Sequence, residues 1–439
     1  MIINRLAASA ALAAALTLAA LVPSGTAGAA SPPTLPQPAA AQSAANWLAA
    51  QIQPNGSIES VAVPGTPDLP STANAVLALA SAGVDQAKAS SALGFMANNV
   101  NAYVTVGEAD GPGQLALLIL DAQALGVSPT SFGGTDLVSR LLATQQTSGS
   151  EVGLFGVQDA TYDGAYRQGL SLAALAAAGV RTGSVVAAAE SWLSAQQCLD
   201  GGWTSLITPA NPCNGRPANY AGPDTNSTAL AVEGMVAQGA LGATAAKSAL
   251  GFFKRAEDVD SGWGYEPKSG SKSSPDPDST ALVIQALLAL GAPPWSSTFV
   301  KSGTDPVALL LADQITSGTG TGAISYPGFP GANLLATYQV IPALAGVTFA
   351  YNIGIPVLTK VSPLRGPVTG GTTVHLTGSS LTEVSNVLFG TTPATSFTVK
   401  SGLSITAVAP PGTSGSVAVT VVSSAGTSAV TSATHYTYR

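Results

Sequence analysis

The chain has 439 residues, of which 46% are hydrophobic and only 9% are charged, and its formal net charge at pH 7 is −7. This length and hydrophobicity suffice for two or three domains with buried cores, which excludes a disordered protein. Acidic residues outnumber basic ones by 22 to 11 between Gln42 and Ile355, whereas residues 356–439 hold 1 acidic and 4 basic residues. Because the large segment has no basic stripe that could neutralise phosphates, we do not expect it to bind nucleic acid.

The first 30 residues follow the pattern of a secretory signal peptide. Arg5 precedes an apolar run from Leu6 to Val22, and small residues at 27–30 fit a signal-peptidase site. A membrane span is the alternative, but the run is mostly alanine and Pro23 ends it. No later apolar run reaches the roughly 18 residues that a span needs. We therefore predict a secreted, extracellular protein, free or associated with a cell surface, with no transmembrane segment once the signal is removed.

Residues 31–42 read as a Pro/Ala linker that does not pack, and six similar units follow from 43 to 350. Each unit holds an amphipathic segment and then an almost wholly apolar segment that ends in glycine, which predicts one outer and one inner helix. Because the apolar helices must be covered on every side, we expect six helical hairpins closed into an α/α toroid. An open solenoid is the runner-up, although it would expose one apolar face. The six glycines, 43 to 60 residues apart, are Gly83, Gly126, Gly179, Gly239, Gly291 and Gly346.

Two stretches of these units carry a family resemblance. "AESWLSAQQCLDGGW" at 189–203 and "EDVDSGWGYEP" at 257–267 resemble the prenyltransferase and squalene-oxidase repeat of the terpenoid cyclase and protein prenyltransferase toroid superfamily. The resemblance covers residues 43–350 and implies the same α/α toroid. Secreted cobalamin-binding proteins of that superfamily also have a small β domain after the toroid, and this chain resembles them in architecture only.

Residues 356–439 form a second region of different character. Short β-rich runs are separated by Gly, Pro and Ser clusters, which is typical of a small sandwich. "SPLRGPVTGGT" at 362–372 and the closing Tyr436 and Tyr438 resemble an immunoglobulin-like IPT/TIG domain, and the resemblance implies an interaction or spacer module. The predicted fold class is therefore multidomain α plus β, an α/α toroid followed by a small immunoglobulin-like β-sandwich.

The two cysteines, Cys198 and Cys213, lie around one Gly/Pro-rich loop. An exported chain meets an oxidising compartment, so the sequence favours a disulfide, with two free buried thiols as the alternative. A zinc site is disfavoured because both histidines, His375 and His435, lie in the C-terminal region. For the same reason we expect neither the zinc chemistry of protein prenyltransferases nor a Ser-His-Asp triad, and no cofactor is predicted.

The fifth inner segment begins with "PDPDSTA" at 275–281. This motif resembles the Asp-x-Asp-Asp-Thr-Ala motif of class II terpene cyclases. The resemblance implies that Asp278, with Asp276 beside it, would be the acid that protonates an alkene or epoxide. Ser279 departs from the pattern, because those enzymes have an aspartate there. The loss of that aspartate weakens the repulsion that would keep one carboxyl group protonated.

Two further observations favour helix capping over catalysis. Asp68 and Asp224 hold the corresponding position in other units, and aspartate is a preferred N-cap residue, so we expect the aspartates of the motif to cap inner helices. Cyclases also hold their carbocation against aromatic faces. Tyr338 is the only aromatic residue in the six apolar segments, which counts against a cyclase.

The loops between outer and inner helices are rich in aromatic and acidic residues, and a closed toroid would gather them at one rim. The structural alternative is that their aromatic rings pack against the neighbouring hairpin. Taken together they form a candidate site for a polar, ring-containing ligand. The ligand-binding candidates are Trp203, Tyr220, Asp224, Trp263, Tyr265, Asp276, Asp278 and Tyr326.

From these observations we predict a secreted, non-catalytic binding protein. Its toroid rim and immunoglobulin-like domain would contact an extracellular small molecule, glycan or protein. One alternative is a terpenoid-cyclase-like enzyme that uses Asp278 and Asp276 as acid. The other is a structural cell-surface or adhesion protein in which the toroid is a scaffold.

Overall fold

A computed structural model describes residues 35–156, 164–204, 213, 222–265, 267, 275–349, 356–379, 381, 384–401, 404–423, 426–428, 430 and 432–439. The predicted signal peptide at 1–30 lies outside these residues. In the part described, no helix is long and apolar enough to cross a membrane.

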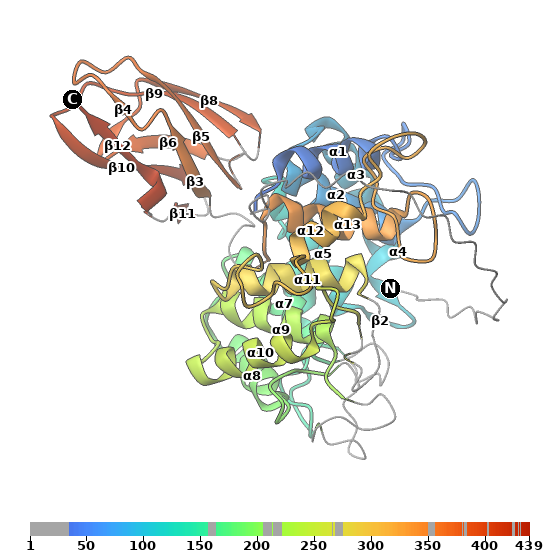
Figure 1. The fold of residues 1–439 in the computed structure, drawn as a ribbon. Helices are drawn as coiled ribbons and strands as arrows, with labels where there is room; N and C mark the ends of the chain where they lie inside the picture. The colour runs from blue at the N-terminus through green and yellow to red at the C-terminus, as the bar shows by residue number, and fades with distance from the viewer. Residues whose placement is uncertain are drawn as a thin grey trace, which may run out of the picture.

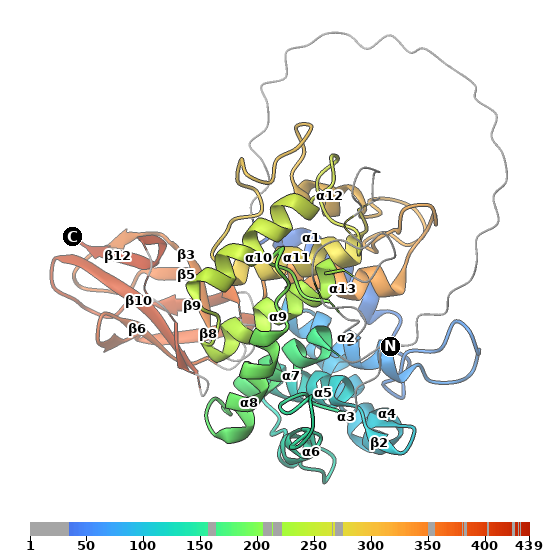
Figure 2. The same cartoon turned by 90° about the horizontal axis from the view of Figure 1, so that it is seen from below.

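The six apolar segments of the sequence form an inner ring of helices. Each inner helix contacts the next along the chain, and the last contacts the first, so the ring is closed (Figures 1 and 2). This confirms the closed toroid and rules out the open solenoid. The inner helices are α2 (Leu69–Ala82), α5 (Pro112–Ala124), α7 (Ala165–Ala177), α9 (Thr225–Gln238), α11 (Pro277–Ala289) and α13 (Leu334–Ala345).

The amphipathic segments form an outer ring, and each outer helix packs against the inner helix that follows it or precedes it in the chain. A short helix, α4 (Val100–Val104), and a two-stranded ribbon of β1 (Thr105–Val106) and β2 (Ala109–Asp110) lie between α3 and α5. The outer helices are α1 (Pro38–Ala49), α3 (Gln86–Asn98), α6 (Leu137–Ala143), α8 (Ser184–Ala195), α10 (Ala243–Ala256) and α12 (Pro306–Ala312).

Helix α1 begins at Pro38, inside the segment that the sequence assigned to a linker. Proline is tolerated at the first position of a helix, and the alanines that follow are strong helix formers. Ala41 is fully buried, and the backbone N–H of Gln37 donates to the carbonyl of Leu344 at 2.7 Å. The ordered toroid therefore starts before Ser43, because these small side chains fill the space between the first and the last unit.

Glutamines at the ends of outer helices link neighbouring units. The side-chain amide of Gln145 donates to the carbonyl of Val185 at 2.7 Å, and that of Gln197 donates to Ala245 at 3.0 Å. Each of these bonds ties one outer helix to the start of the next. In each case the glutamine side chain satisfies a carbonyl of the adjacent hairpin.

Two glycines let the inner helices α7 and α9 approach each other closely. A Cβ atom on Gly169 of α7 would clash with the carbonyl of Leu230, and one on Gly234 of α9 would clash with the carbonyl of Gly169. The backbones therefore touch on this side of the ring, which narrows the barrel there.

Residues 356–438 fold as a sandwich of two sheets (Figure 1). One sheet has the order β3-β5-β9-β8 and the other β4-β12-β10-β6-β7, with β11 paired to β10. Tyr436, which is fully buried, packs edge-to-face on Phe389 and Tyr438 in the core between the sheets. The strands are β3 (Val357–Ser362), β4 (Arg365–Gly366), β5 (Thr373–Ser379), β6 (Val384–Phe389), β7 (Thr392–Pro393), β8 (Ser396–Ser401), β9 (Ser404–Val408), β10 (Gly415–Ser423), β11 (Gly426–Thr427) and β12 (His435–Tyr438).

Candidate functional site

The first aspartate of the repeated motif is an N-cap. The carboxylates of Asp68, Asp224 and Asp276 each accept a hydrogen bond from the backbone N–H three residues later, at 2.9, 2.6 and 2.7 Å. The hydroxyl of Ser279 donates to the second oxygen of Asp276 at 3.0 Å, and the N–H of Tyr265 donates to the same oxygen at 3.3 Å. Asp276 is therefore committed to holding the start of α11 and the loop before it.

The threonine of the motif fastens the preceding loop to the inner helix. The hydroxyl of Thr280 accepts the N–H of Trp263 at 3.0 Å, and that of Thr228 accepts the N–H of Trp203 at 2.9 Å. The same bond joins Thr72 to the N–H of Ile58 at 2.9 Å. The "Ser-Thr-Ala" repeat is thus a structural device that gives a buried N–H group a partner.

The two rim tryptophans belong to the core. Trp203 and Trp263 are 1% and 0% exposed, and their indole N–H groups donate to the carbonyls of Leu193 and Phe253, each at 2.8 Å. These rings fill the space between an outer and an inner helix, which is the structural alternative considered above, so neither can touch a ligand.

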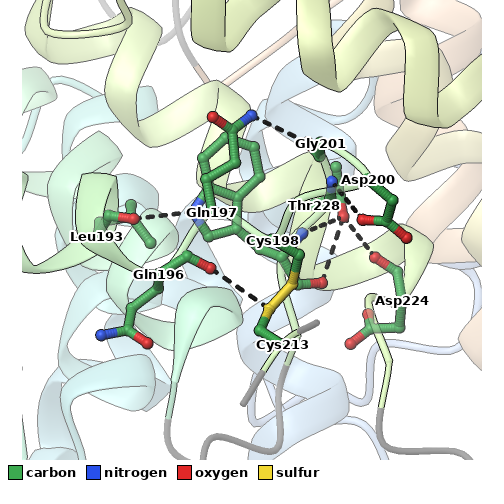
Figure 3. The surroundings of a disulfide bond; sticks show 11 residues. Leu193, Gln196, Gln197, Cys198, Asp200, Gly201, Cys213, Asp224 and Thr228 are labelled. Atoms are coloured by element: carbon green, nitrogen blue, oxygen red, sulfur yellow. Dashed lines mark hydrogen bonds between the residues drawn. A yellow bond between two sulfur atoms is a disulfide. The ribbon is translucent and has the colours of Figure 1, made fainter. Parts of the chain in front are cut away.

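A disulfide joins Cys198 to Cys213, as the sequence predicted (Figure 3). The Cα atoms of the two cysteines are 5.0 Å apart, within the usual range for such a bridge. Figure 3 places the bridge near Gln196, Asp224 and Thr228, beside the start of α9. The predicted ligand residue Tyr220 falls outside the residues that the structure describes.

Asp278 differs from the capping aspartates, and the sequence interpretation that it caps α11 is wrong. It occupies the second helical position after the cap, where the other five units have Pro70, Gly113, Tyr166, Asn226 and Leu335. Its side chain is half-buried, and its Oδ1 has no hydrogen-bond partner among the described residues. Burial, and then the neighbouring carboxylate of Asp276, raise the pKa of Asp278 to about 7.

Four tyrosines stand close enough to the carboxylates at this end of the ring to sense their charge. Tyr338 of α13 and Tyr326 of the loop before it have raised pKa values, through burial and then the charges of nearby aspartates that include Asp278. Burial, followed by the charges of Asp224 and Asp278, raises the pKa of Tyr166 in α7 to about 12. Burial, and then the charge of Asp121, raise the pKa of Tyr103 in α4, and Tyr338, Asp68 and Tyr166 add smaller effects. We call this group, Asp278 with Tyr103, Tyr166, Tyr326 and Tyr338, the tyrosine mouth.

The tyrosine mouth corrects the sequence-based argument from aromatic residues. Only Tyr338 was found on the inner segments, because Tyr166 lies one residue ahead of the apolar run and Tyr103 comes from a short extra helix. Aligning the six helix starts would have identified Tyr166 at the position of Asp278. Tyr103 has no such signal, since nothing local in the sequence shows that α4 turns toward the ring. Of the predicted residues, the mouth contains Asp278 and Tyr326, whereas Tyr265 lies 40% exposed at its edge.

Deeper in the ring, two carboxyl groups are fully buried. Both oxygens of Asp121 on α5, and Oε1 of Glu233 on α9, lack a hydrogen-bond partner within the described ranges. Burial raises the pKa of Asp121 well above its ordinary value and that of Glu233 to about 8. The sequence signal for these two residues was a single acid inside an otherwise apolar segment, in the second and in the fourth unit.

Phe349 closes the opposite end of the ring. Its backbone N–H donates to Oε2 of Glu233 at 2.7 Å, and its side chain packs on the last turns of α7, α9 and α11. The Phe349 side chain packs on four alanines: Ala173, Ala176, Ala237 and Ala289. Only residues 350–355 separate Phe349 from the sandwich, and six residues span at most about 20 Å. The sandwich is therefore tethered at the end of the ring away from the tyrosine mouth.

No cluster of three or more His, Cys, Asp or Glu side chains is placed to hold a metal ion in the described part of the chain. Among the described residues, the chemical groups identified at this end of the ring are the free carboxyl group of Asp278, several phenol hydroxyls and their aromatic faces.

Both domains resemble known folds. The family model described as "IPT/TIG domain" matches residues 356–438, so this region is an IPT/TIG domain. No curated protein sequence matches the chain.

Several solved structures are similar to parts of the chain. An α-1,6-mannanase of Salegentibacter sp. is 11% identical, with a TM-score of 0.50, over 71% of this chain and 98% of that chain. The type II terpene cyclase MstE from Scytonema is 15% identical, with a TM-score of 0.47, over 71% of this chain and 98% of that chain. The extracellular region of plexin A4 is 24% identical, with a TM-score of 0.17, and the match covers 19% of this chain and 8% of that one. At these identities the mannanase shows the α/α toroid fold and no more.

Proposed function

We propose that this toroid with its IPT/TIG domain is a secreted, non-catalytic protein that binds a small, polar, ring-containing molecule at the tyrosine mouth. The observation that carries the proposal is the half-buried carboxyl group of Asp278, whose Oδ1 has no partner among the described residues and whose charge acts on three tyrosines of the mouth. Binding sites combine aromatic walls with a few polar groups in this way.

The IPT/TIG domain has a separate role in this proposal. Because it is tethered beside Phe349, we place it at the end of the ring away from the tyrosine mouth and leave it out of the small-molecule site. We assign it the contact with a protein or cell surface, which is the common use of such interaction modules. The chain would then bind a small ligand at the tyrosine mouth and attach to a protein or cell surface through its IPT/TIG domain.

Secretion is part of the proposal. It rests on the signal-like pattern of residues 1–30, on the disulfide and on the low content of charged residues. An oxidising compartment would keep Cys198 and Cys213 joined.

Hydrolysis of a glycan has less support than binding. The mannanase neighbour has the same fold, but glycoside hydrolysis needs two carboxyl groups that are free to act on the bond. Asp276 is held by Ser279 and Tyr265, and Asp68 caps α2, which leaves Asp278 as the free carboxyl group among those that cap or begin these two helices.

Native mass spectrometry of the secreted protein tests the proposal. We expect a reproducible bound mass that Asp278→Asn and Tyr338→Leu remove, while Asp136→Asn, which alters a cap on the outer helix α6, keeps it. If the protein carries no ligand and binds none from a panel of glycans and small ring compounds, the binding proposal is wrong. The structural role of the toroid as a scaffold would then be favoured over binding.

A second candidate function is acid catalysis by Asp278 on an alkene. The pKa of about 7 favours it, because a half-protonated carboxyl group can donate a proton at neutral pH. Ser279 argues against it, since its hydroxyl bonds Asp276 where a cyclase would have another carboxyl group. Turnover of squalene or a prenyl diphosphate that is lost in Asp278→Asn would establish this function in place of binding.

A further inference from the structure

We propose that the loop between α1 and α2 holds a second binding site, which takes one ring of a hydroxyl-rich sugar. A cavity of about 320 Å³ lies in this loop, which joins the outer and inner helices of the first unit and is drawn in blue in Figure 1. This volume is at the lower end of the range for small-molecule sites, roughly 300–1,000 Å³. The site is separate from the tyrosine mouth, since no residue that lines the cavity belongs to the mouth.

Backbone hydrogen bonds give the loop a fixed shape. The N–H of Gln53 donates to the carbonyl of Ser57, and the N–H of Ser60 donates to the carbonyl of Thr66, each at 2.8 Å. These bonds close two successive hairpins, and residues of both hairpins line the cavity. Ile58, which is buried between the hairpins in sequence, donates its N–H to the hydroxyl of Thr72 on α2 at 2.9 Å. The cavity is therefore formed before a ligand arrives, which lowers the entropic cost of binding.

Charge restricts the ligand class. Glu59 is the one charged residue among those that line the cavity. A phosphate, sulfate or carboxylate ligand would meet this negative charge without an arginine or lysine to bind it, so an anion does not fit. Glu59 is also exposed, and ion pairs at exposed positions contribute little, so an organic cation would gain little from it.

The hydrogen-bonding groups of the cavity are of both kinds. Oε1 of Glu59 accepts the N–H of Gly65 at 2.6 Å, which leaves Oε2 as a free acceptor among the described residues. Oδ1 of Asn55 accepts the N–H and the hydroxyl of Ser57 at 3.0 and 2.9 Å. The amide nitrogen of Asn55 is therefore left with two N–H donors that no described residue accepts.

A sugar ring matches this combination. Each sugar hydroxyl both donates and accepts, so neighbouring hydroxyls on one ring can donate to Glu59 and accept from Asn55. A cation could use the carboxylate but not the amide donors. Pro54 and Pro67 also line the cavity, and their rings offer apolar surface to the C–H groups of the sugar.

Calorimetric titration of the full chain with four sugars tests the site: the methyl glycosides of glucose, galactose, mannose and N-acetylglucosamine. We expect at least one of them to bind. Glu59→Gln keeps an acceptor for the N–H of Gly65, and Asn55→Asp keeps one for Ser57, so both variants should fold. Each should weaken sugar binding at least tenfold, because it exchanges one acceptor for a donor or the reverse. Glu108→Gln, an exposed acid between β1 and β2, is the matched control and should bind as the unsubstituted protein does.

The outcomes separate this site from the tyrosine mouth. Sugar binding that Asp278→Asn removes, and that Glu59→Gln does not change, places the sugar at the mouth and overturns the second site. Choline that binds where the sugars do not, and more tightly in Asn55→Asp, shows a cation site instead. Failure of all four sugars to bind overturns the sugar site and leaves the proposed function at the tyrosine mouth to its own test by native mass spectrometry.

Discussion

The side-chain amide of Gln314 donates a 2.9 Å hydrogen bond to the carbonyl of Ala40, and this contact joins the sixth unit of the ring to the first. The same amide donates to the carbonyl of Gly322, also at 2.9 Å. Ring closure thus depends on a carbonyl from the segment that the sequence assigned to a linker.

Replacing Gln314 with Ala should destabilise the toroid by about 1–3 kcal/mol, because two carbonyl groups lose their donor in a partly buried place. Urea unfolding followed by circular dichroism measures the change. Gln53→Ala is the control, since Gln53 is exposed and makes a single 3.4 Å side-chain bond. Equal stability of the two variants would mean that the ring does not need this link.

Glu233 predicts how stability depends on pH. Its pKa is about 8 in the folded chain, above the ordinary value of 4.5, so the folded state holds a proton that the unfolded state has lost. The folded state therefore loses stability as the pH rises from about 4.5 to about 8, at up to roughly 1.4 kcal/mol per pH unit. Glu233→Gln keeps an oxygen for the N–H of Phe349, and should be more stable than the unsubstituted protein at pH 8 but not at pH 4. Parallel pH dependence of the two proteins would contradict this.

Thr280 should matter through its hydroxyl group alone. Thr280→Val has nearly the same shape but leaves the buried N–H of Trp263 without its acceptor, so we expect a loss of about 1–3 kcal/mol. Thr280→Ser keeps the acceptor and should retain most of the stability. Thermal unfolding of the pair gives the comparison, and an unstable serine variant with a stable valine variant would refute the role of the bond.

The disulfide should stabilise the toroid by about 3 kcal/mol, because Cys198 and Cys213 are separated by 15 positions and their link limits the unfolded chain. The double variant Cys198→Ser/Cys213→Ser should unfold at lower urea concentration than the oxidised protein. A reducing agent should lower the stability of the unsubstituted protein but leave the double variant unchanged. If the agent shifts both equally, the disulfide is not the cause.

Secretion has a direct test. Expression of the full chain in a host that exports proteins should release a protein whose N-terminal sequence begins near Ala30 or Ser31, since the small residues before that point fit a signal-peptidase site. Retention of an uncleaved chain in the cell would contradict the predicted signal peptide.

The sequence by itself determined the two folds. Apolar segments that must be covered on all sides, ending in glycine six times, require a second layer of helices around them, and alternating short runs after Pro356 require a sandwich. Both patterns are local and periodic, so they can be read without coordinates. The capping role of Asp276 and the pairing of the cysteines were predicted in the same way.

Tertiary structure alone decided the candidate site. Asp276 and Asp278 have the same chemistry and lie two residues apart, but only the first caps α11, whereas Oδ1 of the second is buried without a partner among the described residues. Tyr103, Tyr166 and Tyr338 come from three units, and ring closure brings them close enough to act on one another electrostatically. Burial, which removes Trp203 and Trp263 from the site and shifts the pKa of Asp278, depends on neighbours distant in the chain, and no local pattern encodes it.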